Sequence, residues 1–198
     1  MILICRHGQT EWNAESRKQG WLDSDLTELG INQAKALRGG LKTFCQGNKF
    51  KVICSPLGRV RSTAKIALAD ANYVSEISYD DRLKEQSFGA WEGLNSREIE
   101  ISFPGMQEER EKDCWNFRLP EGESYAILEN RLISFLDDIN KSQNIILFCH
   151  EMVSKTLRKI LLDLSEEEAL LLAHDQFSFF VINNKMMHQY NCNPEHEN

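Results

Sequence analysis

Two arginines and two histidines of this chain each come at or just after the end of a short apolar segment. The segments and the residues that follow them are 2–5 with Arg6 and His7, 51–54 with Arg59, and 144–149 with His150. Arginine binds oxyanions through a planar fork of donors, and histidine can act as a nucleophile or proton donor near neutral pH. Four such groups in one pocket would repel one another unless an anion lay among them. A phosphoryl group has the charge and the acceptor geometry to do so, and the pattern therefore predicts a phosphoryl-binding site.

The three apolar segments have the composition of short buried strands. In open α/β sheets, ligands bind in the crevice at the carboxyl ends of the parallel strands. If the three segments are parallel neighbours, the residues that follow them converge on one spot. Gly8 comes directly after His7, and a glycine there lets the backbone approach a ligand closely.

The periodicity of the apolar residues indicates further helices and strands. Thr27 is a suitable N-cap for a helix over 28–44. The apolar face of that helix is expected to consist of Ile31, Ala34, Leu37 and Leu41. The other expected elements are a helix after Pro56, a long loop over 80–95, a charged and partly helical segment at about 96–118, helices near 124–140 and from 150 to about 162, and strands over 177–182 and 185–190 joined by a turn at Asn183-Asn184.

This alternation of strands and helices predicts an α/β fold, a three-layer α/β/α sandwich with a mostly parallel mixed sheet. The length of 198 residues is typical of one domain. We therefore expect a single domain over 1–198. The segment at about 96–118 is expected as an insertion that covers the site.

Taken together, these residues resemble the histidine phosphatase superfamily, whose members include cofactor-dependent phosphoglycerate mutases. The matching residues, in chain order from residue 1 to about 160, are Arg6-His7-Gly8-Gln9-Thr10, Trp12-Asn13, Gln19-Gly20-Trp21, Asp25-Leu26-Thr27, Gly30, Gln33-Ala34, Ser55-Pro56-Leu57, Arg59, Thr63-Ala64, Leu83, Glu85, Phe88-Gly89, Trp91-Glu92-Gly93, Gly122-Glu123-Ser124 and His150. Any single motif is weak, but the ordered combination is specific. The resemblance implies a phosphoglycerate mutase-like fold.

The resemblance also implies roles for the residues at the strand ends. His7 is expected to attack phosphorus and form a phosphohistidine, which water then hydrolyses. Arg6, Arg59 and His150 are expected to bind the equatorial oxygens of the transferring group, where fixed positive donors stabilise the transition state. No metal or other cofactor is expected to take part.

Glu85 is the candidate general acid. An alkoxide is a poor leaving group, so a proton must reach the bridging oxygen. Phe88 and Trp91 beside Glu85 would raise the pKa of its carboxyl group to suit this task. Composition alone favours a surface Glu85 paired with Lys84 or Arg82, and the resemblance reverses that preference. Glu92 is expected to have a structural role.

Four more residues are candidates for contact with the substrate. Asn13 suits a hydrogen bond to it, and almost equally a turn or helix cap; Gln19 and Gly20 lie where they can touch the group beyond the phosphate, and Gln19 also suits an ordinary loop position. Glu151 is a departure, because the family usually has Gly after the second histidine. Its carboxylate either interacts favourably with the dipole of the helix that begins there, or narrows the pocket and selects a substrate bearing a cation or several hydroxyls.

Phosphatases and mutases of this family share their chemistry and differ in what accepts the phosphoryl group. A mutase must shield phosphohistidine from water and hold a bisphosphate, which requires longer covering segments and more cations. The short chain and the stretch Gln86-Ser87-Phe88-Gly89-Ala90-Trp91-Glu92-Gly93, with Gly122-Glu123-Ser124, look more like the phosphatase branch, which includes α-ribazole phosphatases and broad-specificity enzymes. A phosphatase is expected. A mutase is the alternative, and a non-catalytic phospho-ligand-binding protein is favoured only by Glu151.

Composition and charge narrow the partners. The net charge of −7 argues against nucleic acid and anionic membranes but is compatible with a locally positive cleft. No apolar run is long enough to span a membrane, and residues 1–5 are too short for the apolar part of a secretory signal. We expect a cytoplasmic protein that acts on a small phosphomonoester. The oligomeric state and the choice among sugar phosphate, nucleotide-loop precursor and phosphoamino acid stay open.

The six cysteines do not form a metal or disulfide pattern, because no C-x-x-C pair is present. Cys5, Cys54 and Cys149 end predicted strands and are expected to be small buried hydrophobic residues. A redox role for Cys149, beside His150, is the alternative. Zinc bound by His7, His150 and Glu85 is disfavoured because two arginines in the same pocket would repel a cation.

Overall fold

The computed structural model describes residues 1–140 and 142–192, which form one mixed six-stranded sheet and eight α-helices. The strands are β1 (Ile2–Arg6), β2 (Phe50–Cys54), β3 (Val74–Tyr79), β4 (Ile145–Cys149), β5 (Ser178–Asn183) and β6 (Met186–Asn191), in the spatial order β3-β2-β4-β1-β5-β6. Strands β1 to β4 are parallel to one another, and β5 and β6 add antiparallel strands beside β1.

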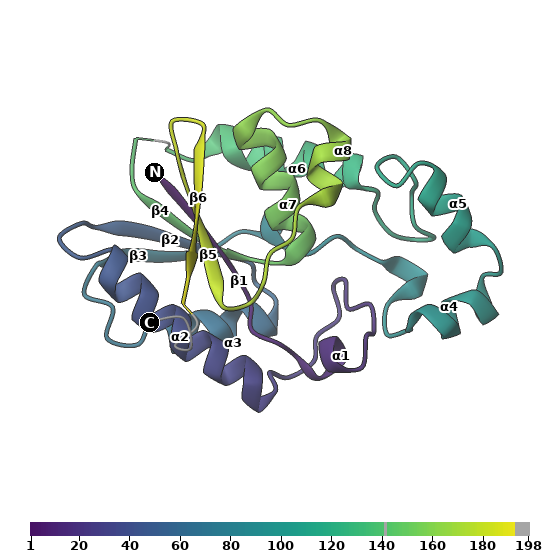
Figure 1. The fold of residues 1–198 in the computed structure, drawn as a ribbon, viewed down its shortest axis with the longest axis horizontal. Coiled ribbons are helices and arrows are strands. Elements are labelled where there is room, and N and C mark those ends of the chain that lie inside the picture. Colours follow the sequence, from purple (N-terminus) through teal and green to yellow (C-terminus); the bar gives the residue numbers. More distant parts are fainter. Residues whose placement is uncertain (141, 193–198) are drawn as a thin grey trace.

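The helices cover both faces of this sheet (Figure 1). They are α1 (Glu11–Ala14), α2 (Glu28–Phe44), α3 (Gly58–Ala67), α4 (Ser96–Ser102), α5 (Met106–Lys112), α6 (Tyr125–Asp138), α7 (Glu151–Leu162) and α8 (Glu166–Leu171). Helices α2 and α3 lie on one side of the sheet and α6, α7 and α8 on the other, whereas α4 and α5 lie at the end of the molecule away from β3. The predicted α/β fold class is confirmed.

Each face of the sheet has its own hydrophobic core because successive side chains of a strand point to opposite faces. On one face, Leu3 and Cys5 pack with Leu37 of α2. On the other, Ile4 packs with Leu132 of α6. The strands are buried on both faces, which is why they read as unbroken apolar runs in the sequence.

The register of the central strands brings their carboxyl ends to one level. In the parallel β1–β4 pair Arg6 lies opposite Cys149, and in the parallel β2–β4 pair Cys54 lies opposite Phe148. The prediction that these three segments are parallel neighbours is therefore confirmed.

Most predicted helices are present, with one correction to a face and some omissions. Thr27 caps α2, its Oγ1 accepting the Gly30 N–H at 3.0 Å. The inward place predicted for Ile31 is wrong: the residue is 36% exposed, and the turn of the helix buries Gly30 and Gln33 instead. His150 is the N-cap of α7, and the helix itself begins at Glu151. The elements that the sequence analysis did not predict are α1, β3 and α8.

The segment that carries the predicted acid is largely a loop, as expected. Residues 80–95 contain only two short 3₁₀ turns, Asp81–Leu83 and Gly89–Trp91. The predicted insertion at 96–118 begins with α4 and α5. Ile99 of α4 packs with Phe88 and Trp91 in a small separate hydrophobic cluster.

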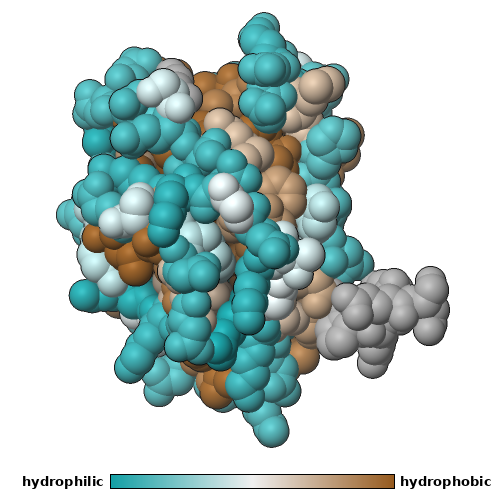
Figure 2. All heavy atoms as spheres, turned by 90° about the vertical axis from the view of Figure 1, so that its left-hand side faces the viewer, coloured by the Kyte–Doolittle hydropathy of each residue, from teal (hydrophilic) through white to brown (hydrophobic). Residues whose placement is uncertain are grey.

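The edge of the sheet at β3 is partly open. Ile77 and Tyr79 of this strand are about half exposed, at 50% and 51%. With residues of α3 they line a hollow of about 470 Å³, and Figure 2 shows apolar patches among hydrophilic side chains on this side of the molecule. Every helix in the described part of the chain falls short of the length or the apolar character that crossing a bilayer requires.

Candidate active site

A pocket of about 260 Å³ opens at the carboxyl ends of β1, β2 and β4. The predicted site residues that line it are Arg6, His7, Asn13, Gln19, Gly20, Arg59, Glu85 and Glu151. The remaining one, His150, is fully buried beside His7, with 5.2 Å between the centres of the two rings. The structure thus brings together all nine residues. We call Arg6, His7, Arg59 and His150 the cup.

The ring of His7 is held in the tautomer that a nucleophile requires. Its Nδ1 lies 2.8 Å from the carbonyl oxygen of Gly8. A carbonyl can only accept, so Nδ1 carries the proton and Nε2 keeps its lone pair. Burial, and after it the charges of Arg59 and Arg6, lower the pKa of His7 well below its usual value. The imidazole is therefore neutral, with a free nitrogen at the pocket.

Gly8 allows the loop after β1 to pack against the start of α2. A Cβ at this position would lie 2.3 Å from the carbonyl oxygen of Gly30. The Gly8 N–H donates to Thr63 Oγ1 at 3.0 Å. Gly30 is in α2 and Thr63 in α3, and only glycine fits between these two helices. This explains why glycine directly follows the nucleophile.

Arg59 is almost completely buried, and its terminal nitrogens hold the loop at 20–23 against the cup. Nη1 donates to the Leu22 carbonyl and to Asp23 Oδ1, both at 2.7 Å, and Nη2 donates to the Gly20 carbonyl at 2.8 Å. Asp23 also accepts the Gly58 N–H at 2.6 Å, at the beginning of α3. These contacts fix the orientation of the guanidinium.

Protein acceptors likewise fix the orientation of Arg6, and they come from α7 and from the segment between α8 and β5. Its Nη1 donates to the carbonyl of His174 at 2.6 Å, and its Nη2 forms an ion pair with Glu151 Oε2 at 2.9 Å. His174 is itself buried. Its ring is buried between Ser154 Oγ and the Ser178 carbonyl, so that its backbone provides a fixed acceptor for Arg6.

Three nitrogen atoms of the cup are buried without any hydrogen-bond partner. Within the described ranges, six buried side-chain polar atoms have none, and Arg6 Nε, Arg59 Nε and His150 Nδ1 are half of them. His150 Nε2 lies 2.8 Å from the hydroxyl of Ser55, which can donate to it and leave the proton on Nδ1. Buried unpaired donors are costly. An anion with several acceptor oxygens would pair all three.

Glu85 places a carboxyl group beside the cup. The residue is 8% exposed, and its carboxylate accepts the N–H groups of Gln86 at 3.0 Å and Met152 at 3.4 Å. Burial raises the pKa of Glu85, with the charge of Arg59 acting in the opposite direction. Lys84 pairs with Asp81, and Arg82 with Asp80 and Asp138, so the surface ion pairs considered for Glu85 are replaced by other partners.

Glu92 joins the two loops that form one wall of the pocket. One oxygen, Oε1, accepts from the N–H of Trp21 at 3.0 Å, the N–H of Phe88 at 3.1 Å and the hydroxyl of Ser87 at 3.3 Å. Gly20 has a φ of +54°, and a Cβ there would lie 2.1 Å from the same oxygen. Glu92 has the structural role predicted for it.

Asn13 and Gln19 have local partners and also line the pocket. Asn13 Oδ1 accepts the Thr10 N–H at 3.1 Å and completes a capping box at α1. Gln19 Oε1 accepts from the Ser24 hydroxyl at 3.2 Å. Both interpretations of these residues, as cap or loop residue and as pocket wall, are compatible with the geometry.

The cysteines at the strand ends are buried thiols. Cys5, Cys54 and Cys149 are inaccessible to solvent, and burial raises the pKa of Cys54 to about 12 and that of Cys149 further. An un-ionised, inaccessible thiol is a poor redox group. In the part of the chain that the structure describes, no cluster of His, Cys, Asp or Glu side chains has the composition of a metal site.

The sequence matches the family described as the histidine phosphatase superfamily (branch 1) over residues 2–188. The chain belongs to this superfamily, as the resemblance predicted.

Several named relatives are phosphatases. Phosphoserine phosphatase 1 of Hydrogenobacter thermophilus is 29% identical over 184 residues, which are 91% of this chain and 85% of the relative. Glucosyl-3-phosphoglycerate phosphatase of Mycolicibacterium vanbaalenii is 38% identical over 106 residues, or 54% of this chain. That match spans 45% of the relative's own length, and a match to the rat 6-phosphofructo-2-kinase/fructose-2,6-bisphosphatase 3 spans 28% of that protein.

Solved structures show the same fold. The α-ribazole phosphatase from Shigella flexneri has a TM-score of 0.81 at 26% identity, covering 96% of this chain and 94% of the other. A mycobacterial glucosyl-3-phosphoglycerate phosphatase in complex with VO3 has a TM-score of 0.76 at 28% identity, with 90% of each chain covered.

Proposed function

We propose that this protein is a phosphomonoester hydrolase that acts on a small phosphorylated metabolite through a phosphohistidine intermediate. The observation that carries the proposal is the arrangement of the cup. Three unpaired buried nitrogens belong to Arg6, Arg59 and His150, which line the pocket with the neutral His7 or lie beside its ring. A phosphoryl group placed there would satisfy the donors and present phosphorus to the nucleophile.

In the first step, the lone pair of His7 Nε2 attacks phosphorus in line with the ester bond. The bond between phosphorus and the ester oxygen breaks, and the protonated carboxyl of Glu85 gives its proton to that oxygen. Arg6, Arg59 and His150 hold the equatorial oxygens. Each such donor is worth about 3–4 kcal/mol in comparable sites.

In the second step, water attacks the phosphohistidine. Glu85, now ionised, takes a proton from the water as it forms its bond to phosphorus. The bond from phosphorus to His7 Nε2 breaks, orthophosphate leaves, and Glu85 is protonated again. The raised pKa of Glu85, which burial causes, suits a group that must alternate between these two states.

We assign the leaving group to the side of the pocket lined by Asn13, Gln19, Gly20 and Glu151. Ser96, at the start of α4, also lines it, which supports the insertion at 96–118 as a cover of the site. The side chain of Glu151 is partly exposed and lines the pocket. We infer that this carboxylate favours leaving groups with a cation or hydroxyls over leaving groups that are anions. A single domain over 1–198 and a cytoplasmic location stay predictions.

The proposal is tested by turnover of p-nitrophenyl phosphate and a panel of phosphorylated metabolites. We expect His7→Ala to lose activity by on the order of 10⁴-fold or more, because the nucleophile is removed. His188→Ala, an exposed histidine on β6, should retain it. The P–N bond of phosphohistidine is labile in acid but survives at alkaline pH, so a quench of the wild type with alkaline detergent during turnover of ³²P-labelled substrate should trap label on His7. Binding without turnover would overturn the proposal, and isomerisation of a phosphoglycerate only with a bisphosphate primer would identify a mutase instead.

A further inference from the structure

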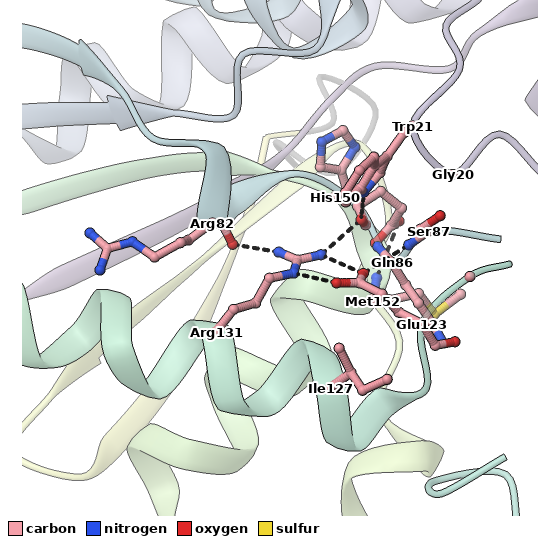
Figure 3. A network of polar contacts seen from close by, with 12 residues as sticks. Gly20, Trp21, Arg82, Gln86, Ser87, Glu123, Ile127, Arg131, His150 and Met152 are labelled. Atoms are coloured by element: carbon pink, nitrogen blue, oxygen red, sulfur yellow. Dashed lines mark hydrogen bonds and ion pairs between the residues drawn. The ribbon is translucent and has the colours of Figure 1, made fainter. Parts of the chain in front are cut away.

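Arg131, which the catalytic scheme does not use, lies between Arg82 on one side and Gln86 and Glu123 on the other (Figure 3). Its guanidinium extends from α6, and two of its nitrogens donate to the two carboxylate oxygens of Glu123, each at 2.9 Å. Nη2 also donates to the carbonyl of Glu85 at 2.9 Å, and Nη1 donates to the carbonyl of Arg82. One side chain thus binds both ends of the segment 82–85.

A second donor reaches the same carbonyl from another loop. The indole Nε1 of Trp21 donates to the Glu85 carbonyl at 2.8 Å. With the contact from Arg131, this carbonyl receives two hydrogen bonds from opposite parts of the chain. The peptide plane that follows Glu85 is therefore fixed in orientation. We call Trp21, Glu123 and Arg131 the clamp.

Glu123 extends the clamp to the next residues of the segment. Its Oε2 accepts the Ser87 N–H at 2.9 Å, and its backbone carbonyl accepts from Gln86 Nε2 at 3.0 Å. The pair of Glu123 with Arg131 is mostly shielded from water, with side-chain exposures of 12% and 16%. A charge pair in this setting is strong and directional.

The carboxylate of Glu85 has weaker restraints than its backbone. It accepts only backbone N–H groups, from Gln86 at 3.0 Å and from Met152 at 3.4 Å, and Arg59 and Arg6 attract it electrostatically. A general acid must lie within hydrogen-bond reach of the leaving oxygen and stay protonated until it acts. A shift toward either arginine would spoil both conditions.

We propose that Arg131 is a positioning residue for Glu85. Through the backbone carbonyls of residues 82 and 85, and with Trp21 as second donor, it holds the carboxyl group over the cup and away from the arginines. This inference rests on the proposed function, in which Glu85 is the acid. It predicts that, in the first step, the defect depends on whether the leaving group needs a proton.

The test compares two substrates whose leaving groups differ in basicity. Release of the alkoxide from β-glycerophosphate requires a proton, whereas p-nitrophenolate leaves readily without one. Because kcat also includes hydrolysis of the phosphohistidine, which needs Glu85 with either substrate, the test uses kcat/KM, which reports the steps up to release of the leaving group. We expect Arg131→Met to lower kcat/KM for β-glycerophosphate by about ten- to a hundredfold and kcat/KM for p-nitrophenyl phosphate by less than about threefold. An equal loss with both substrates, or none, would overturn the positioning role.

Lys159→Met is the matched control. Lys159 pairs with Glu129 of α6, and the two side chains are 16% and 18% exposed, nearly the same as in the Arg131–Glu123 pair. The Lys159 ammonium lies over the ring of Trp115 and is not part of the Glu85 segment. Loss of this pair should lower stability by a similar amount. The ratio of the two kcat/KM values should stay at the wild-type value.

Trp21→Phe is a second variant for the case in which Arg131→Met fails to fold. Its side chain is 46% exposed, so the change removes the indole donor at little cost to the fold. The ratio of kcat/KM values should shift in the same direction as in Arg131→Met, by a smaller factor of about three to ten. An unchanged ratio in this well-folded variant would count against the clamp.

Glu85→Gln separates the two proposals. If Glu85 is the acid, this variant shows the largest shift in the ratio, about 10²- to 10⁴-fold for the alkyl substrate. A wild-type ratio in Glu85→Gln would overturn the assignment of the acid itself. A large shift in Glu85→Gln together with wild-type ratios in the Arg131 and Trp21 variants would overturn the positioning role alone.

Discussion

The cup and the clamp are both built around arginine, and they use its donors in opposite ways. In the cup, Arg6 and Arg59 bind protein acceptors through their terminal nitrogens, and each retains a buried Nε without a partner. In the clamp, every nitrogen of Arg131 has a protein acceptor. An unpaired buried donor costs about 1–3 kcal/mol, and the cup contains several.

This difference separates residues that bind a ligand from residues that hold others in place. The protein orients the cup arginines with part of their donors and leaves the rest for an anion. The guanidinium of Arg131 has no nitrogen left for a ligand, so its effect on catalysis must pass through the groups that it binds. Unpaired buried donors therefore locate the phosphate more directly than the number of cations does.

The largest expected effect comes from a change that breaks the cup. Arg59→Lys offers three donors on one nitrogen in place of five on three, so it cannot hold Asp23 and the Gly20 and Leu22 carbonyls and also bind a phosphoryl oxygen. We expect kcat/KM for p-nitrophenyl phosphate to fall by about 10²- to 10³-fold. Orthophosphate should raise the Tm of the wild type and have little effect on the variant.

Arg38→Lys, in an exposed ion pair with Asp70, is the control for loss of an arginine, and both its activity and its response to phosphate should match the wild type. Retention of wild-type kcat/KM and of the phosphate-dependent shift in Arg59→Lys would contradict the assignment of the cup.

A second, smaller effect is the pH dependence of activity. It is expected to come from Glu85, which lies beside the cup and whose backbone the clamp binds. Burial raises the pKa of Glu85, and the acid acts in its protonated form. Activity on β-glycerophosphate should therefore be full below this pKa and fall about tenfold per pH unit above it. The pKa of His7 is lowered, so the nucleophile stays neutral and no loss is expected from it on moderate acidification.

Profiles of kcat/KM against pH for the wild type and Glu85→Gln provide the measurement. The decrease due to Glu85 should be absent in the variant, whereas the titration of the substrate phosphate, with a pKa of about 6, affects both proteins alike. Identical profiles apart from a constant factor would show that Glu85 does not titrate in the reaction.

The cup is predictable from the sequence because its members follow buried strands. Parallel strands covered on both faces produce apolar runs, and His7 and His150 come directly after two of them. The residue types then indicate the chemistry. Glu85 lies in a loop without such a run, and only the resemblance to a known family identified it.

The clamp is not predictable in this way, because its contacts involve backbone and distant partners. Arg131 follows Glu129 and Asn130 in α6 and has the appearance of a solvated position, yet it binds groups 8, 46 and 49 residues away. The support of Arg6 by the carbonyl of His174 likewise does not depend on the type of residue. Such contacts arise only once the chain has folded.

Two of the elements that were not predicted, α8 and β3, differ in whether the sequence contains a signal for them. Ser165 is the N-cap of helix α8 and forms a capping box with Glu168 three residues later, a signal that is present in the sequence. Strand β3 lies at the edge of the sheet, and its exposed Ile77 and Tyr79 break the pattern of burial that marks the other strands.

The smallest expected effect concerns Glu151. It forms an ion pair with Arg6 and so occupies a donor of the cup, as Glu123 does with Arg131 in the clamp. Its carboxylate lies 2.9 Å from Arg6 Nη2 and competes with any phosphoryl oxygen for that donor. In Glu151→Gln the negative charge is removed, and we expect the Kd for orthophosphate to fall about tenfold, which corresponds to about 1.4 kcal/mol for a charge this close to the bound anion. Glu166→Gln, at the same first helical position in α8 and exposed, should leave the Kd unchanged. Isothermal titration calorimetry with orthophosphate measures the Kd of both variants. Equal affinities of Glu151→Gln and the wild type would mean that phosphate binding does not depend on Arg6 Nη2. Glu151 would then act on the leaving group alone.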